Sequence, residues 1–371
     1  MPLTQIQSGM MDSVAQYYGF KNRIINGAMV IDQRNAGASV TVNSTAAAYP
    51  VDRWYGQGEA TDGVFTLQQS TDAPAGFIRS LKATVTTADA SIGSSQVYRF
   101  IQRIEGNNLA DLNLGLSSAS AFTISFWVKS SVTGTFGGSL WGASATEWYV
   151  FSYTINSANT WEYKTVNVPA RTSGSFDVGT GIGLQLQFSL GAGSSRLTTA
   201  GSWINGATEY YGVTGQTNLI GTLNATWFIT GVQLEKGSTA TSFDYRPYGT
   251  ELQLCQRYCV NYRSADANGA YYRYTWGECV STTQQQGNVS FPVQMRVFPS
   301  LTVTSTASNY AVYSRGGVTA CSSVPTIGAD SANVLSSNII ANVSSGLTTG
   351  SGGALLSGNN QISYLLFTAE L

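Results

Sequence analysis

The sequence predicts an all-β protein with two β-sandwich, jelly-roll-like domains joined by a short helix. Two stretches alternate apolar and polar residues, AFTISFWVKS (121–130) and GLQLQFSLG (183–191). This period of two is typical of half-buried strands. Clusters of Gly, Ser, Asn and Thr, such as SVTGTFGGS (131–139), separate the runs. No helical periodicity exceeds about two turns and no repeat of fixed length is present, which argues against β-helices and propellers.

The alternation gives each of these strands two faces. In residues 121–130 the apolar side chains share one face, and Trp127 and Lys129 lie on the opposite, polar face. In residues 183–191, Gln185 and Gln187 alternate with apolar side chains and are therefore expected to point outwards.

Two further strands are predicted near the C-terminus. The apolar positions of NVSFPVQMRV (288–297) alternate, and Pro292 on the other face suggests an edge strand or a bulge. The last residues, QISYLLFTAEL (361–371), are predicted to form a final strand that fixes the C-terminus.

The boundary between the domains is predicted from a change in local pattern. A strand ends near Leu234, an aromatic turn containing Pro247 follows, and Thr250 and Gln253 fit a capping box at the start of a short helix. The predicted organisation is an N-terminal arm at 1–20, a first sandwich at 21–248, a linking helix at 249–260 and a second sandwich at 261–371.

Composition excludes several classes of function. Of the 371 residues, 11% are charged and the net charge is −1, so no basic surface is available for nucleic acid. No apolar run is long enough to span a bilayer, so membrane insertion is not expected. The N-terminus lacks the basic and apolar regions of a secretory signal, so a route out of the cell would be lysis or an assembled particle.

Histidine is absent, which excludes His-dependent triads and His-ligated zinc. The four cysteines, Cys255, Cys259, Cys279 and Cys321, lack the paired spacing of a zinc ribbon. Cys255 and Cys259 are four residues apart and are expected to share a face of the short helix. Buried thiols, one or two disulfides, and metal binding all remain open, with buried thiols favoured.

Aromatic side chains offer candidate sugar-binding sites, because Trp and Tyr rings stack on the apolar faces of sugars while amides and charged groups bind hydroxyls. The candidate residues are Trp127, Trp148, Trp161, Gln185, Gln187, Tyr271, Tyr272, Arg273 and Trp276. The alternative, that these aromatic rings fill the sandwich cores, remains open for each of them.

Three segments resemble tail-fibre and minor structural proteins of tailed bacteriophages. They are FKNRIINGAMVIDQRNAG with YPVDRWYG, then TGVQLEKGSTATSFDYRPYGTELQLCQRY, then FPVQMRVFPSLTV with the terminal AEL. The resemblance covers about a quarter of the chain and implies a jelly roll similar to a carbohydrate-binding module, followed by a small β domain. It also implies a homotrimer whose N-terminal arm binds other virion proteins.

The resemblance also suggests where a metal would lie, since such jelly rolls often hold a structural calcium near their first and last strands. Asp32, Glu235 and Asp244 fall there and carry suitable oxygen atoms, although solvated carboxylates are the favoured interpretation. For catalysis, a pair of carboxylates cleaving a glycan is the remaining option. The available ones are Asp52, Asp62, Asp72, Glu147 and Glu162.

These observations lead to one leading hypothesis and two alternatives. The leading one is a non-enzymatic phage tail fibre, part of the virion, that binds a host cell-surface polysaccharide and needs no cofactor. The first alternative is a purely structural virion component, such as a head fibre, decoration or baseplate protein. The second is a glycan-cleaving depolymerase.

Overall fold

The computed structural model describes residues 20–58, 62–142, 146–266, 271–328 and 333–371. Nearly all of the predicted arm, 1–19, lies outside these residues. The chain divides into two compact units, 1–251 with Leu371, and 252–370, and each is described by itself. The division falls within the α-helix α2 (Tyr248–Gln256).

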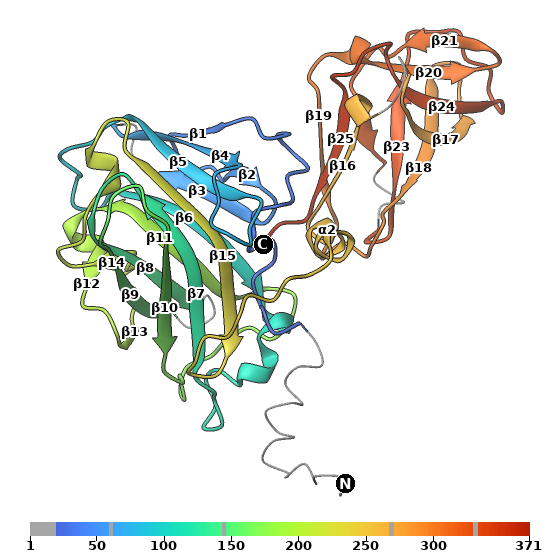
Figure 1. Ribbon diagram of the computed structural model, residues 1–371. Helices are drawn as coiled ribbons and strands as arrows, with labels where there is room; N and C mark the ends of the chain where they lie inside the picture. Colours follow the sequence, from blue (N-terminus) through green and yellow to red (C-terminus); the bar gives the residue numbers. More distant parts are fainter. Residues whose placement is uncertain (1–19, 59–61, 143–145, 267–270, 329–332) are drawn as a thin grey trace, which may run out of the picture. The chain divides into compact units, whose positions relative to one another are not determined.

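The first unit consists of two antiparallel sheets that face each other (Figure 1). The six-stranded sheet A has the order β1 (Val40–Val42), β4 (Val64–Ser70), β5 (Ser80–Thr87), β15 (Thr226–Lys236), β7 (Phe122–Ser130) and β10 (Glu162–Val168). The seven-stranded sheet B has the order β13 (Trp203–Asn205), β9 (Glu147–Ile155), β8 (Gly134–Gly142), β11 (Ile182–Ala192), β6 (Val97–Glu105), β3 (Trp54–Gly58) and β2 (Ala48–Val51).

Short elements complete this unit. A small parallel pair is formed by β12 (Leu197–Thr198) and β14 (Gly212–Val213). The 3₁₀ turns are η1 (Gly106–Asn108), η2 (Ala110–Leu112), η3 (Ser194–Arg196) and η4 (Leu219–Gly221).

The core of the first unit lies between sheets A and B. The apolar face predicted for residues 121–130 is confirmed, since Phe122, Ile124, Phe126 and Val128 are all fully buried. Large aromatic rings from both sheets fill the space between them, and their burial is the main stabilisation of the fold.

The second unit contains a three-stranded and a seven-stranded sheet around a separate core. The smaller sheet has the order β16 (Cys259–Arg263), β25 (Tyr364–Thr368) and β19 (Ser300–Val303). The larger has the order β21 (Gly317–Ala320), β20 (Tyr310–Ser314), β24 (Gly352–Ser357), β17 (Arg273–Cys279), β18 (Gln284–Ser290), β23 (Ser336–Asn342) and β22 (Thr326–Ile327). Two 3₁₀ turns, η5 (Ser264–Asp266) and η6 (Ala307–Asn309), complete it.

The all-β, two-sandwich fold class is therefore confirmed, and so is the terminal strand, which is β25. Strand β25 pairs with both β16 and β19, so it holds the centre of the smaller sheet. Among the residues that the structure describes, no helix has the length and apolar character needed to cross a bilayer.

The strand predicted over 288–297 was largely wrong, since only its first three residues lie in a strand. Strand β18 runs from Gln284 to Ser290, and bends and irregular backbone follow it. Pro292 has no N–H for a ladder, which accounts for the early end. Met295 is nevertheless fully buried, and its N–H donates to the carbonyl of Val334 at 2.8 Å. Buried and exposed residues therefore still alternate after Ser290, with Phe291 and Met295 buried, although these residues form no strand.

The start of the helix was also predicted wrongly. Helix α2 begins at Tyr248, and the N–H of Glu251 donates to the carbonyl of Pro247 at 3.0 Å. Thr250 thus lies inside the first turn and is not the cap.

The cysteines do not share a helical face. Cys255 belongs to α2, whereas Cys259 begins β16. All four cysteines are buried as thiols. Burial raises the pKa of the Cys321 thiol to about 12, so this group stays protonated at physiological pH.

Candidate functional site

The outer face of sheet A carries a row of side chains that point away from the core. In this row Trp127 on β7 is directly opposite Tyr163 on β10 and Thr230 on β15. The rings of Trp127 and Tyr163 lie 5.4 Å apart between centroids. Trp127 is half-buried and Tyr163 is 43% exposed. The polar-face position predicted for Trp127 is therefore confirmed.

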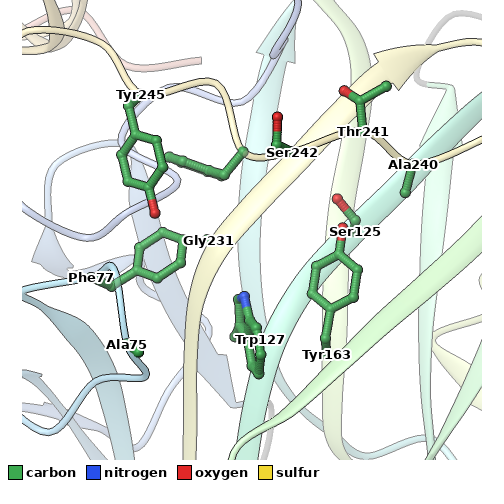
Figure 2. Close-up of a pocket in the computed structure, with 11 residues that line it drawn as sticks. Ala75, Phe77, Ser125, Trp127, Tyr163, Gly231, Ala240, Thr241, Ser242 and Tyr245 are labelled. Atoms are coloured by element: carbon green, nitrogen blue, oxygen red, sulfur yellow. The ribbon is translucent and has the colours of Figure 1, made fainter.

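These two rings form one wall of an open hollow, here called the Trp127 hollow, of about 590 Å³. Figure 2 shows Trp127 and Tyr163 on one side of Gly231, with Phe77 and Tyr245 on the other. The lining residues are Ala75, Phe77, Ser125, Trp127, Tyr163, Gly231, Ala240, Thr241, Ser242, Phe243 and Tyr245. None of them carries a formal charge at neutral pH.

Gly231 keeps the hollow open. It lies in β15 where the pairing with β7 shifts between Thr230 and Gln233, and its φ is +62°. A Cβ at this position would lie 2.6 Å from Cζ of Phe77 and 3.2 Å from Cδ1 of Trp127. A side chain at this β-bulge would therefore close the gap between the two aromatic walls.

The second wall is a cluster of three aromatic rings, Phe77, Phe243 and Tyr245. Their centroids lie 5.0 to 5.5 Å apart. The Tyr245 hydroxyl donates to the carbonyl of Gly76 at 3.1 Å, which fixes the ring beside the loop that carries Phe77. This wall is built from two loops, yet its rings hold one another in place.

Polar groups lie at the rim of the Trp127 hollow and on the edge of the Trp127 ring. Lys21 Nζ donates to the carbonyl of Ser242 at 2.7 Å and to Thr241 Oγ1, so it positions the rim segment. Within the described parts of the chain, no group accepts a hydrogen bond from the indole N–H of Trp127. The hollow thus offers stacking surfaces together with an unused donor, the combination that suits an uncharged sugar ring.

Trp161 lies on the same face, next to the hollow. Its indole N–H donates to Oδ1 of Asp72 at 3.1 Å, and Asp72 also pairs with Lys129. The Lys129 ammonium lies 4.3 Å from the ring centroid of Phe228. The hydrogen bond from Lys129 lowers the pKa of Asp72. The structure therefore brings Trp127 and Trp161 onto one surface, with the indole N–H of Trp161 already paired.

Trp148, Gln185 and Gln187 lie together on the outer face of sheet B, but this face is covered. Their exposed fractions are 3%, 3% and 0%. The prediction that the two glutamines point away from the core was right, whereas the prediction that they are open to a ligand was wrong. The segment carrying Leu197 and Tyr211 packs over Trp148, so a second layer removes this face from solvent.

A hydrogen-bonded network satisfies the two buried amides. Gln187 Nε2 donates to Ser139 Oγ at 2.6 Å, and its Oε1 accepts from Arg99 and from Gln185, each at 3.2 Å. Gln185 Oε1 accepts from Arg103 Nε at 3.0 Å. These amides therefore hold strands together and stabilise the sandwich.

The remaining sugar-binding candidates belong to the second unit. Tyr271 and Trp276 are 48% and 62% exposed, Arg273 is exposed, and Tyr272 is half-buried.

The calcium candidates use their oxygen atoms within the chain. Asp32 accepts backbone N–H groups of its own loop, including that of Asn35 at 2.8 Å. Glu235 accepts the N–H of Thr241 at 2.8 Å, and Asp244 accepts the N–H of Asn22 at 3.1 Å. In the described residues no group of three or more acidic or cysteine side chains is arranged to hold a metal ion.

The carboxylates considered for catalysis are each paired. The donors are Arg34 and Gln33 for Asp52, Gln96 for Asp62, Lys129 and Trp161 for Asp72, Arg171 and Asn205 for Glu147, and Lys164 with Asn156 and Ser157 for Glu162. Partial burial raises the pKa of Glu162, but the hydrogen bonds from Lys164, Ser157 and Asn156 outweigh it and bring the pKa to about 2. A general acid needs a pKa raised towards neutrality, the opposite direction.

The sequence reasoning did not assign Phe77, Phe243 and Tyr245 to a site, because they lie on loops whose folding over sheet A no periodicity reveals. Gly231, however, could have indicated from the sequence that something unusual occurs in this strand. An isolated glycine inside a strongly apolar strand indicates a bulge or a close approach by another group.

No protein-family model and no curated protein matches the sequence. Among solved structures, the chain is similar to the enzymatically active domain of tailspike protein 4 from bacteriophage CBA120, with 14% identity and a TM-score of 0.32. That match covers 58% of this chain and 22% of the tailspike chain. A putative sugar-binding protein from Bacteroides thetaiotaomicron matches with 14% identity and a TM-score of 0.36, over 58% of this chain and 100% of that one.

A family 11 carbohydrate-binding module from Clostridium thermocellum, in complex with a β-1,3-1,4-mixed-linked tetrasaccharide, matches with 11% identity and a TM-score of 0.28. It covers 57% of this chain and 100% of the module. The chain is thus similar to carbohydrate-binding modules and to a phage tailspike domain. Similarity at this level carries no argument about what the chain binds.

Proposed function

We propose that this protein is a non-enzymatic virion fibre component that binds a host cell-surface glycan through the Trp127 hollow. The observation that supports binding is the hollow itself, in which Trp127 and Tyr163 face Phe77 and Tyr245 across Gly231. Two aromatic walls on an uncharged, hydroxyl-rimmed cavity suit the apolar faces of a neutral sugar.

Binding without cleavage is part of the same proposal. Asp72, an acidic group on this face, is paired with Lys129, and Glu162, on the core-facing side of the edge strand β10, is paired with Lys164. Both have lowered pKa values. A carboxylate held ionised in this way is poorly suited to protonate a glycosidic oxygen.

The assembly and location rest on the sequence resemblance alone. By that resemblance the protein is a homotrimer in the virion, attached to other virion proteins through residues 1–20. Three linked copies would raise the avidity of a site that is weak by itself.

The test is binding of the fluorescently labelled protein to candidate host cells, before and after periodate oxidation of the surface glycans. We expect saturable binding that periodate removes and that Trp127→Ala weakens at least tenfold, with blocked adsorption of the parent phage. Binding that resists periodate would point to a protein receptor. A folded protein that binds no cells would move the chain to the structural class.

A further inference from the structure

The second unit exposes a tryptophan in the middle of its larger sheet. Trp276 lies on β17, which has three strands on each side, and it is 62% exposed. The guanidinium carbon of Arg273 lies 4.5 Å from its ring centroid and 5.6 Å from that of Tyr313. Arg273 therefore stacks on one face of the Trp276 ring and fixes its orientation, while much of the ring stays exposed to solvent.

Trp276 belongs to a row that crosses five strands. Tyr313 is opposite Ala354, Ala354 is opposite Trp276, Trp276 is opposite Asn288, and Asn288 is opposite Asn338. Residues directly opposite one another point to the same side of a sheet. With neighbouring strands about 4.8 Å apart, the row spans about 19 Å, from aromatic side chains at one end to amides at the other.

The amides beside the row are aligned by their own hydrogen bonds. Asn338 Nδ2 donates to Gln286 Oε1 at 3.0 Å, and Gln286 Nε2 donates to Gln284 Oε1 at 2.9 Å. Gln284 Nε2 in turn donates to Asn342 Oδ1 at 3.1 Å. Each amide carries two N–H donors, and Asn338, Gln286 and Gln284 each use one in these bonds, so each keeps a second N–H for another partner.

The chemistry of this face favours a sugar chain over a second protein subunit. Trp276 is exposed among amides, and the exposed Val318 lies on the edge strand β21, opposite Tyr313, whereas a stable interface between copies would need a continuous apolar core. Arg273 and Glu278 balance each other in formal charge, and the amides are neutral. A row of neutral donors and acceptors beside a stacking ring suits hydroxyl groups.

We propose that this face of the second unit, the Trp276 row, binds an extended neutral polysaccharide that lies across the strands. This site does not depend on the Trp127 hollow. It is flat where the hollow is concave, so it would hold several sugar residues of one chain, each weakly.

The test is binding to a microarray of neutral and acidic bacterial polysaccharides, using the full chain, Trp276→Ala, Trp127→Ala and the double variant. We expect the full chain to bind some of the neutral polysaccharides. For these, the signal should fall at least tenfold in Trp276→Ala and stay within twofold in Trp127→Ala. Asn288→Ala should lower the same signals about threefold, since Asn288 is exposed and next in the row. Signals should rise with chain length until the ligand spans the row.

If every bound polysaccharide lost its signal in Trp127→Ala and kept it in Trp276→Ala, this inference would be overturned and the hollow proposal would stand. Signals lost in Trp276→Ala alone support this inference and leave the hollow to its own test on host cells. Binding restricted to acidic polysaccharides, or to none, would also overturn it. Oxidation of Trp276 by N-bromosuccinimide, mapped by peptide mass spectrometry, adds a readout independent of folding. A bound neutral polysaccharide should slow it in Trp127→Ala, and unchanged oxidation would contradict contact at this face.

Discussion

The outer faces of sheets A and B arise from the same sequence pattern but differ in their role. In both, polar residues alternate with the core-facing residues of an interior strand, β7 in one sheet and β11 in the other, and β7 adds the outward Trp127. On sheet A, loops border the row and leave Trp127 beside an open hollow. On sheet B, a further layer buries Trp148 and Gln187. The pattern therefore identifies the face opposite the core and does not show whether that face is open.

The strongest way to test this contrast is to disturb the buried network. Gln187→Ala should lower the free energy of unfolding by about 2 kcal/mol, because Ser139 and Arg99 lose a buried partner. Glycan binding should stay within twofold. Chemical denaturation checks the first value, and cell binding checks the second.

The matched control is Ser152→Ala, an exposed position on β9 of the same sheet. It should change stability by less than about 0.5 kcal/mol. Reduced binding in Gln187→Ala at unchanged stability would contradict the structural role of sheet B.

The second prediction concerns the opening of the hollow. Gly231→Ala should weaken glycan binding about tenfold, because the added methyl group would lie too close to Phe77 and Trp127 and would fill the gap between the two aromatic walls. A stability loss of about 1 kcal/mol is expected as well, since φ at this position is +62°.

Gly37→Ala separates these two effects. Its φ is +81°, and nothing lies within 4 Å of the added Cβ. It should show a similar loss of stability with full binding. Equal loss of binding in both variants would mean that backbone strain, and not the shape of the hollow, is responsible.

The smallest expected effect is the pH dependence of Glu162, on the core-facing side of the edge strand β10. Its pKa is lowered from 4.5 to about 2, so its contribution to stability is complete above pH 4.5 and is lost as the pH falls towards 2. Glu162→Gln should cost at most about 1 kcal/mol near neutral pH, as for surface ion pairs. The difference from the wild type should vanish near pH 2, as thermal unfolding at several pH values can establish.

The sequence was sufficient for the fold class, since the alternation in residues 121–130 and the terminal strand reappear as β7 and β25. It also placed Trp127 on the correct face. It could not show that Gln185 is buried, because Arg103 and Tyr55, which donate hydrogen bonds to it, come from strands far away in the sequence. Nor could it reveal the second wall of the hollow, since Phe77 and Tyr245 are brought together only by tertiary folding.

The most direct test compares two tryptophans, Trp127 and Trp148, that the sequence alone makes equal candidates for stacking on a sugar. Trp127→Ala and Trp148→Ala would be measured for unfolding free energy and for affinity towards a polysaccharide that the Trp276→Ala variant still binds. We expect Trp148→Ala to lose about 3–5 kcal/mol of stability and to keep its affinity where it remains folded. Trp127→Ala should lose at least tenfold in affinity with a smaller loss of stability. Loss of affinity in Trp148→Ala, with full affinity in Trp127→Ala, would contradict the account.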